Sequence, residues 1–175
     1  MPRLPMIERD AMPEPLAQLV ASRPPLNLYK VLANAPAAAQ GFMALGGALL
    51  RESSLDPKLR ELVILRVGAL SGAGYEVHQH RQLAARVGVP PVKIAAALRE
   101  VGDAAFDEQE RAILAFTDAV VQEVKAPEPL YDAVAARLDH RQVSELILTI
   151  GFYMLVSRFL ENAEVEIEAA SVPLA

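Results

Sequence analysis

The amino-acid sequence predicts an all-α protein, and three observations support that prediction. Hydrophobic residues make up 53 % of the 175 residues, whereas aromatic residues make up only 5 % and tryptophan is absent. Much of the apolar content is alanine and leucine, which favour packed helices over sheets. No stretch combines sustained alternation of apolar and polar residues with the valine, threonine and tyrosine enrichment of a strand. The length indicates one domain with a sizeable core.

Proline residues divide the first part of the chain into short predicted elements. Residues 1–12 are predicted to form a loose N-terminal arm, and residues 13–175 a single helical domain. We expect one short helix within residues 13–25 and another within residues 26–36, each bounded by proline. An apolar helix that contains a Gly-Gly pair is expected over residues 37–53.

The middle of the chain predicts two helices separated by a small-residue break. Asp56 can cap the first of them, with Pro57 at its first position. This helix is apolar nearly all round after Glu61, which indicates a buried helix. The segment "SGAG" at residues 71–74 ends it. The following "YEVHQHRQLAARVG" predicts a second helix that ends at Gly88, because glycine readily adopts the left-handed conformation of a helix end.

The rest of the chain predicts further helices, and the last of them resembles the helix that follows Asp56. Both sequences open with Leu-Asp and carry a glutamate before an apolar run, so Glu61 corresponds to Glu145 if one residue is inserted. The likeness fits either an internal duplication or a chance similarity of two buried helices. The expected helices of this part lie within residues 90–100, 107–124, 127–138 and 140–164.

Charge and composition exclude several classes of function. The net charge is −5 with both signs spread along the chain, so a nucleic-acid partner is not expected. The chain has no cysteine, which excludes disulfides, thiolate metal sites and thiol-based chemistry carried by this chain. No signal peptide is visible, and the longest apolar stretch, residues 145–156, is shorter than the ~20 residues that span a bilayer. We therefore expect a soluble cytoplasmic protein without a membrane partner.

The stretch "YEVHQH" contains the first candidate site. On a helix, His78 and His80 lie about 200° apart and cannot share one metal ion, so no metal site is expected. Glu76 and His80 are four residues apart and share a face. A carboxylate there can orient the imidazole and raise its pKa, which suits proton transfer. The alternative is an ordinary surface ion pair of four-residue spacing.

Three more side chains are candidate site residues. Glu61 begins a buried helix, so its carboxylate needs a partner such as Arg60, His80 or Tyr75, or it simply favours the helix N-terminus. Tyr75 is either a hydrogen-bond donor to a bound oxyanion or a plain aromatic residue at a helix start. Arg66 interrupts an apolar helix, where it can reach the surface, pair with an acid or bind a substrate carboxylate.

The segment from residue 55 to residue 98, with Arg-Glu before an apolar helix, a small-residue break, Tyr-Glu and then histidine, resembles the carboxymuconolactone decarboxylase family. That superfamily includes the alkyl hydroperoxidase AhpD-like proteins. Its redox branch has Glu, eleven residues, Cys-x-x-Cys, three residues and His. Glu61 and His80 match the ends of that pattern, whereas Ala73 and Glu76 occupy the cysteine positions. Dithiol peroxidase chemistry is therefore excluded here.

The resemblance implies an AhpD-like all-helical subunit with orthogonally packed helices that forms an oligomer, commonly a trimer or hexamer. Its Tyr-Glu pair is that of the decarboxylase-like branch, although authentic decarboxylases of that branch are shorter than this chain. We expect a cofactor-free decarboxylase of a small carboxylactone in aromatic-compound catabolism. The alternatives are a related lactone hydrolase or isomerase and a catalytically inert oligomeric binding protein. The expected catalytic residues are His80, Glu76 and Glu61, and the expected substrate contacts are Tyr75, His78 and Arg66.

Overall fold

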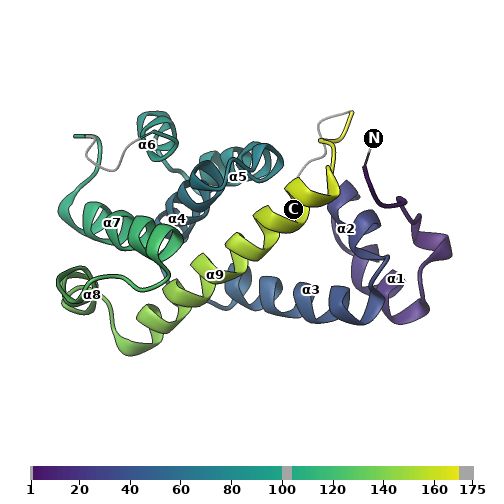
Figure 1. Ribbon diagram of the computed structural model, residues 1–175, viewed down its shortest axis with the longest axis horizontal. Helices are drawn as coiled ribbons and strands as arrows, with labels where there is room; N and C mark the ends of the chain where they lie inside the picture. The colour runs from purple at the N-terminus through teal and green to yellow at the C-terminus, as the bar shows by residue number, and fades with distance from the viewer. Residues whose placement is uncertain (1, 100–103, 170–175) are drawn as a thin grey trace. The chain divides into compact units, whose positions relative to one another are not determined.

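The computed structural model describes residues 2–99 and 104–169, and the regular structure within these ranges is entirely helical (Figure 1). This confirms the all-α fold class. Residue 1, the final residue of the helix expected over 90–100 and the last six residues of the chain lie outside the described residues. The elements are a 3-10 turn at Arg9–Ala11 and the α-helices α1 Glu14–Ala21, α2 Asn27–Leu32, α3 Pro36–Arg51, α4 Pro57–Leu70, α5 Gly74–Arg86, α6 Pro91–Ala97, α7 Glu108–Glu123, α8 Glu128–Ala135 and α9 His140–Ala163.

The described residues fall into two compact units, and the first consists of those within the ranges 1–52 and 159–175. Within it, α1 and α2 both pack against α3. The backbone of the N-terminal segment is held by hydrogen bonds from Arg3 N to Ala163 O (2.8 Å) and from Ile7 N to Lys30 O (3.1 Å). The assignment of residues 1–12 to a loose arm and of the remainder to a single domain stays a prediction.

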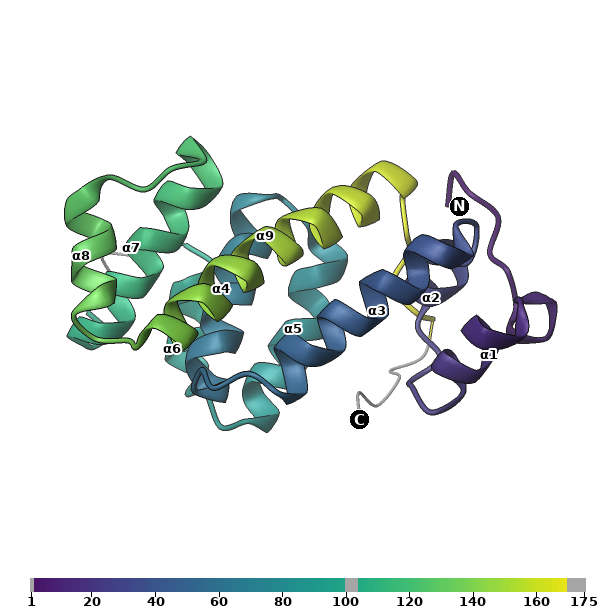
Figure 2. The same cartoon turned by 90° about the horizontal axis from the view of Figure 1, so that it is seen from below.

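The second unit, residues 53–158, is built around α4, which packs against α5, α6 and α7 (Figures 1 and 2). As expected, Asp56 caps α4: its carboxylate accepts hydrogen bonds from the backbone nitrogens of Lys58 (2.9 Å) and Leu59 (3.1 Å). Burial covers every residue from Leu59 to Gly68, which confirms a helix enclosed on all sides. The apolar core beside it comprises Leu62, Leu65, Ala84, Val89, Ile94, Ala96, Ala97, Phe106 and Leu114.

Two glycines shape the α4–α5 hairpin, one within α4 and one just after α5. Gly68 marks a close approach of the two helices, because a Cβ atom there would lie 3.1 Å from Val77 Cγ2 and 3.6 Å from Glu76 Cγ. At the other end of α5, Gly88 has φ of +87°, which confirms the predicted left-handed helix end. The α4–α5 hairpin is therefore fixed both in its spacing and at its far end.

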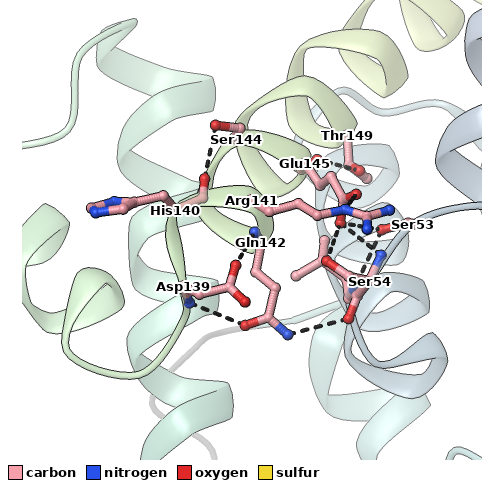
Figure 3. A network of polar contacts seen from close by, with 10 residues as sticks. Ser53, Ser54, Asp139, His140, Arg141, Gln142, Ser144, Glu145 and Thr149 are labelled. Atoms are coloured by element: carbon pink, nitrogen blue, oxygen red, sulfur yellow. Dashed lines mark hydrogen bonds and ion pairs between the residues drawn. The ribbon is translucent and has the colours of Figure 1, made fainter.

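A polar network ties the start of α9 to the segment that precedes α4 (Figure 3). Glu145 Oε2 accepts hydrogen bonds from the hydroxyls of Ser53 (3.0 Å) and Ser54 (2.7 Å) and from the backbone nitrogen of Ser54 (2.7 Å). Its other oxygen, Oε1, accepts one from Arg141 Nε (2.8 Å). Gln142 adds a bond from its amide nitrogen to the carbonyl of Ser54 (3.2 Å). These contacts fix where α4 begins relative to α9.

We predict that Glu145→Gln lowers the free energy of unfolding at neutral pH by about 1–3 kcal/mol, because a charged acceptor of several hydrogen bonds is lost. Burial raises the pKa of Glu145, but the bonds from Ser54, Arg141 and Ser53 outweigh it and lower the pKa from 4.5 to about 2. The stabilisation is therefore present above pH 4.5 and is lost as the pH falls towards 2.

Urea denaturation of the wild type and of Glu145→Gln, at neutral pH and at about pH 3, measures the difference in their free energies of unfolding. The gap between them should narrow at the lower pH. The exposed Glu123→Gln on α7 is the matched control and should leave stability unchanged. An equal loss in both variants, or a gap that widens in acid, would contradict the assignment.

Candidate functional site

The centre of the candidate site is an imidazole held between two carboxylates. His80 and Glu76 lie on α5, and Glu61 lies on the facing helix α4. Glu61 Oε2 is 2.7 Å from His80 Nδ1, and Glu76 Oε1 is 3.0 Å from His80 Nε2. Both ring nitrogens therefore have an acidic partner, and each carboxylate binds a different side of the same ring.

Local structure explains why these three side chains meet. Glu76 and His80 are four residues apart on α5, so they lie one above the other on one helix face. The tight connection at residues 71–73 folds α5 back along α4, which brings Glu61 to the same ring although it lies 19 residues earlier. The absence of a side chain at Gly68 lets α4 approach α5 closely at Val77, the residue next to Glu76.

The three groups are almost completely buried. The exposed fractions of Glu61, Glu76 and His80 are 2 %, 3 % and 6 %, and that of the neighbouring Arg60 is 7 %. Arg60 Nε lies 3.9 Å from Glu61 Oε1. With His80 protonated, two positive and two negative charges cancel within one buried cluster, which is the condition under which burial of such groups is tolerated.

The charge state of His80 follows from this surrounding. Burial lowers the pKa of the imidazole, but the charges of Glu61 and Glu76 and the hydrogen bonds to both raise it, with a net rise from 6.5 to about 10. Because both nitrogens face carboxylate oxygens, both must carry a proton to donate. The cluster therefore holds an imidazolium ion at neutral pH.

Tyr153 on α9 closes one side of this imidazolium. Its ring meets that of His80 edge-on, with centroids 5.0 Å apart and an angle of 84° between the planes. Phe152 packs against Tyr153 in the same manner at 5.4 Å. In the sequence, Tyr153 is only one residue of an apolar run. Its ring contact with His80 of α5 makes it part of the site.

The three expected substrate contacts, Tyr75, His78 and Arg66, lie in different surroundings. Tyr75 is buried in the first turn of α5. His78 is exposed, and its Nε2 lies 3.2 Å from Gln82 Nε2. The expectation that His78 and His80 point apart on a helix is therefore confirmed. Because Glu61 and Glu76 occupy opposite nitrogens of one ring, their oxygens and the ring do not converge on a point where one metal ion could sit.

Arg66 is engaged away from the imidazole. Its guanidinium makes a two-pronged ion pair with Asp118 of α7, through Nε (2.6 Å) and Nη2 (2.7 Å). Its remaining nitrogen, Nη1, donates to the carbonyls of Ala97 (3.4 Å) and Arg99 (2.7 Å). These partners use the donors that a substrate carboxylate would need, so Arg66 acts in the structure as a link between α4, α6 and α7.

Comparison with known proteins bears on the family and the fold. Residues 36–119 match the model of the carboxymuconolactone decarboxylase family. No curated protein matches the chain.

Several solved structures share the fold. An uncharacterised peroxidase-related protein from Ralstonia eutropha, described as an alkylhydroperoxidase AhpD core, has a TM-score of 0.86 at 19 % identity, with 96 % of this chain and 93 % of that chain covered. A cysteine-to-alanine variant of the debrominase Bmp8 in complex with 2,3,4-tribromopyrrole has a TM-score of 0.79 at 21 % identity, over 95 % and 92 %. A protein of unknown function from Agrobacterium tumefaciens, described as a putative AhpD, has 0.74 at 21 %, over 79 % and 96 %. At these identities the likeness shows the AhpD-like fold, which confirms that part of the prediction.

We predict that the wild-type protein becomes less stable as the pH rises above neutrality. A group whose pKa is raised on folding stabilises the protein fully below its unfolded value, 6.5, and loses that effect as the pH approaches about 10. Urea denaturation at pH values of about 7 and 9 should show a falling free energy of unfolding. His140→Gln, which changes an exposed histidine, should keep this slope, whereas His80→Gln should remove it. A wild-type stability that is flat or rises over this interval would contradict a protonated His80.

Proposed function

We propose that the protein is a cofactor-free proton-transfer enzyme of the decarboxylase-like branch of the carboxymuconolactone decarboxylase family, whose model matches residues 36–119. The observation that carries this proposal is the buried imidazolium of His80 between Glu61 and Glu76. Such a group is a proton store, and proton delivery is the chemistry that decarboxylation of a small carboxylactone requires.

The reaction balances with one proton. Cleavage of the bond between the ring carbon and the carboxylate releases carbon dioxide and leaves the electron pair on the lactone as a dienolate. A proton must then be added to carbon. His80 has no free nitrogen for direct contact, so its proton passes to Glu61 or Glu76 and from that carboxyl group to the substrate. Solvent restores the proton after the product leaves.

The cysteine-based reactions of the wider superfamily are not part of this proposal. Ala73 and Glu76 stand where the redox pattern places cysteines, and the sequence contains none. The debrominase neighbour was solved as a variant with one cysteine replaced by alanine, so that protein has a thiol that this chain does not have. A related lactone hydrolase or isomerase would use the same acid–base groups, and product analysis separates these reactions.

A second candidate is a non-catalytic binding protein of the same fold. It is favoured by the completeness of the cluster, because both nitrogens of His80 are occupied and the four charges balance without a ligand. In that case the cluster only holds α4 against α5. Turnover decides between the two candidates, because an inert cluster predicts stable folding with no consumption of lactone substrate.

We also propose self-association through one face of α9. This helix has a mean hydropathy of 1.6 over its most apolar 18 residues and could span a membrane by length and composition, yet half of that window is buried inside the fold. Ile147, Leu148 and Leu155 are exposed on one face of it at 42 %, 51 % and 53 %. Such an apolar stripe on a soluble helix is typical of a subunit interface. A cytoplasmic, trimeric or hexameric protein remains our expectation.

We predict that the purified protein consumes carboxymuconolactone, and that His80→Gln lowers kcat/KM by about 10²–10⁴-fold, the usual contribution of a positioned acid. Loss of substrate absorbance gives the rate, and product analysis identifies the reaction. Glu61→Gln and Glu76→Gln locate the carboxylate that delivers the proton, since the delivering one should cost more. His140→Gln is the matched control. No turnover by wild type, or full turnover by folded His80→Gln, would overturn this function.

We predict that Leu148→Glu and Leu155→Glu shift the protein to a smaller species, because each places a charge in the proposed apolar interface. Size-exclusion chromatography with light scattering measures the mass. Val92→Glu changes an equally exposed apolar residue on α6 and should leave the mass unchanged. A wild-type monomer would contradict this interface, as would an unchanged mass in both α9 variants.

A further inference from the structure

The two arginines that interrupt the apolar course of α4 have opposite hydrogen-bond states. Arg66 donates four hydrogen bonds, to Asp118 and to two carbonyls. Arg60 is equally buried, with 8 % of its side chain exposed, yet its Nε is buried and donates no hydrogen bond within the described part of the chain. Its nearest carboxylate oxygen, Glu61 Oε1, is 3.9 Å away, beyond hydrogen-bond distance.

A buried N–H without an acceptor is costly, because Arg60 Nε has lost its water and gained no replacement. Glu61 does not fill this role, since its other oxygen is committed to His80 at 2.7 Å. We infer that Arg60 is the binding residue for the carboxylate group of a small ligand, which supplies the missing acceptor. The planar fork of a guanidinium matches two carboxylate oxygens, and that match favours this class of ligand over a spherical anion.

The position of Arg60 relates this site to the proton store. Its Nε lies next to Glu61, and Glu61 in turn contacts His80 Nδ1. A carboxylate bound at Arg60 would therefore lie beside Glu61. Both carboxylates would then interact with the positive charge of the Arg60 guanidinium. The ligand would then approach the cluster from the side of Glu61, the carboxylate that contacts His80 Nδ1.

This assignment rests on the proposed function only in treating the ligand as the substrate. It selects Glu61 rather than Glu76 as the carboxyl group that passes the proton on. It also transfers the carboxylate-binding role that the sequence suggested for Arg66 to the other arginine of the same helix, because the donors of Arg66 are already used.

Binding can be tested without turnover. The probe is 2-furoate, a five-membered ring carboxylate, with the neutral 2-furamide as the uncharged counterpart. Titration of nitrogen-15-labelled protein, followed by NMR through the arginine Nε–H signals, should shift the Arg60 signal with 2-furoate and leave it in place with 2-furamide. Arg60→Gln should weaken 2-furoate binding by about tenfold or more, since hydrogen bonds to charged groups are lost. Arg81→Gln, which removes an exposed positive charge from α5, should leave binding unchanged.

Arg60→Lys keeps the charge without the fork and should bind 2-furoate more weakly than wild type, which keeps the test usable if Arg60→Gln does not fold. The assignment is overturned if 2-furoate fails to shift the Arg60 signal, if chloride shifts it equally, or if folded Arg60→Gln and wild type bind alike. Binding at Arg60 with no lactone turnover would support this site and overturn the decarboxylase. Lactone turnover combined with unchanged 2-furoate binding in Arg60→Gln would support the decarboxylase and overturn this site.

Discussion

The burial of a charged imidazole between two carboxylates is the interaction on which the rest of the second unit depends. In a low-dielectric interior, neither Glu61 nor Glu76 can remain ionised without a positive partner, and His80 supplies it to both. The cluster requires α4 and α5 to approach closely and in one register, which the absence of a side chain at Gly68 permits. Removing one member leaves the others as uncompensated buried charges.

The polar residues of α4 and of the segment before it each connect to a different neighbour. Glu61 binds His80 of α5, Arg66 binds Asp118 of α7, and Ser54 binds Glu145 of α9. Apolar packing alone would let a helix that is buried all round rotate or slide, because its faces are alike. The three directional polar contacts fix the rotation of α4 about its axis and its position along that axis. They therefore also fix the position of the proton store.

Sequence reasoning predicted most of the fold because the relevant signals are local. The Asp56 cap, the Gly88 helix end and the apolar course of α4 all depend on neighbouring residues along the chain. The pairing of Glu76 with His80 is likewise a four-residue spacing on one helix. That Glu61 reaches the second nitrogen of His80 depends on how α5 folds back onto α4, and spacing alone left three partners open for that carboxylate.

The arginines show the limit of such reasoning more clearly. Arg60 and Arg66 both appear in the sequence as positive residues in a buried helix, and nothing local distinguishes them. Asp118, which uses the donors of Arg66, lies 52 residues further along the chain and is brought in by α7. The same holds for Tyr153, which faces His80 from α9. Residues supplied by distant helices become site residues only once the packing is known.

The ionisation of His80 is the most direct measure of the central claim. Nitrogen-15 NMR of the labelled imidazole at about pH 8 distinguishes a doubly protonated ring from a neutral one, because the two nitrogens then have similar rather than widely separated shifts. We predict that both nitrogens of His80 carry protons at this pH and that the ring titrates only as the pH approaches about 10. A neutral His80 ring at this pH, with a titration near 6.5, would contradict it.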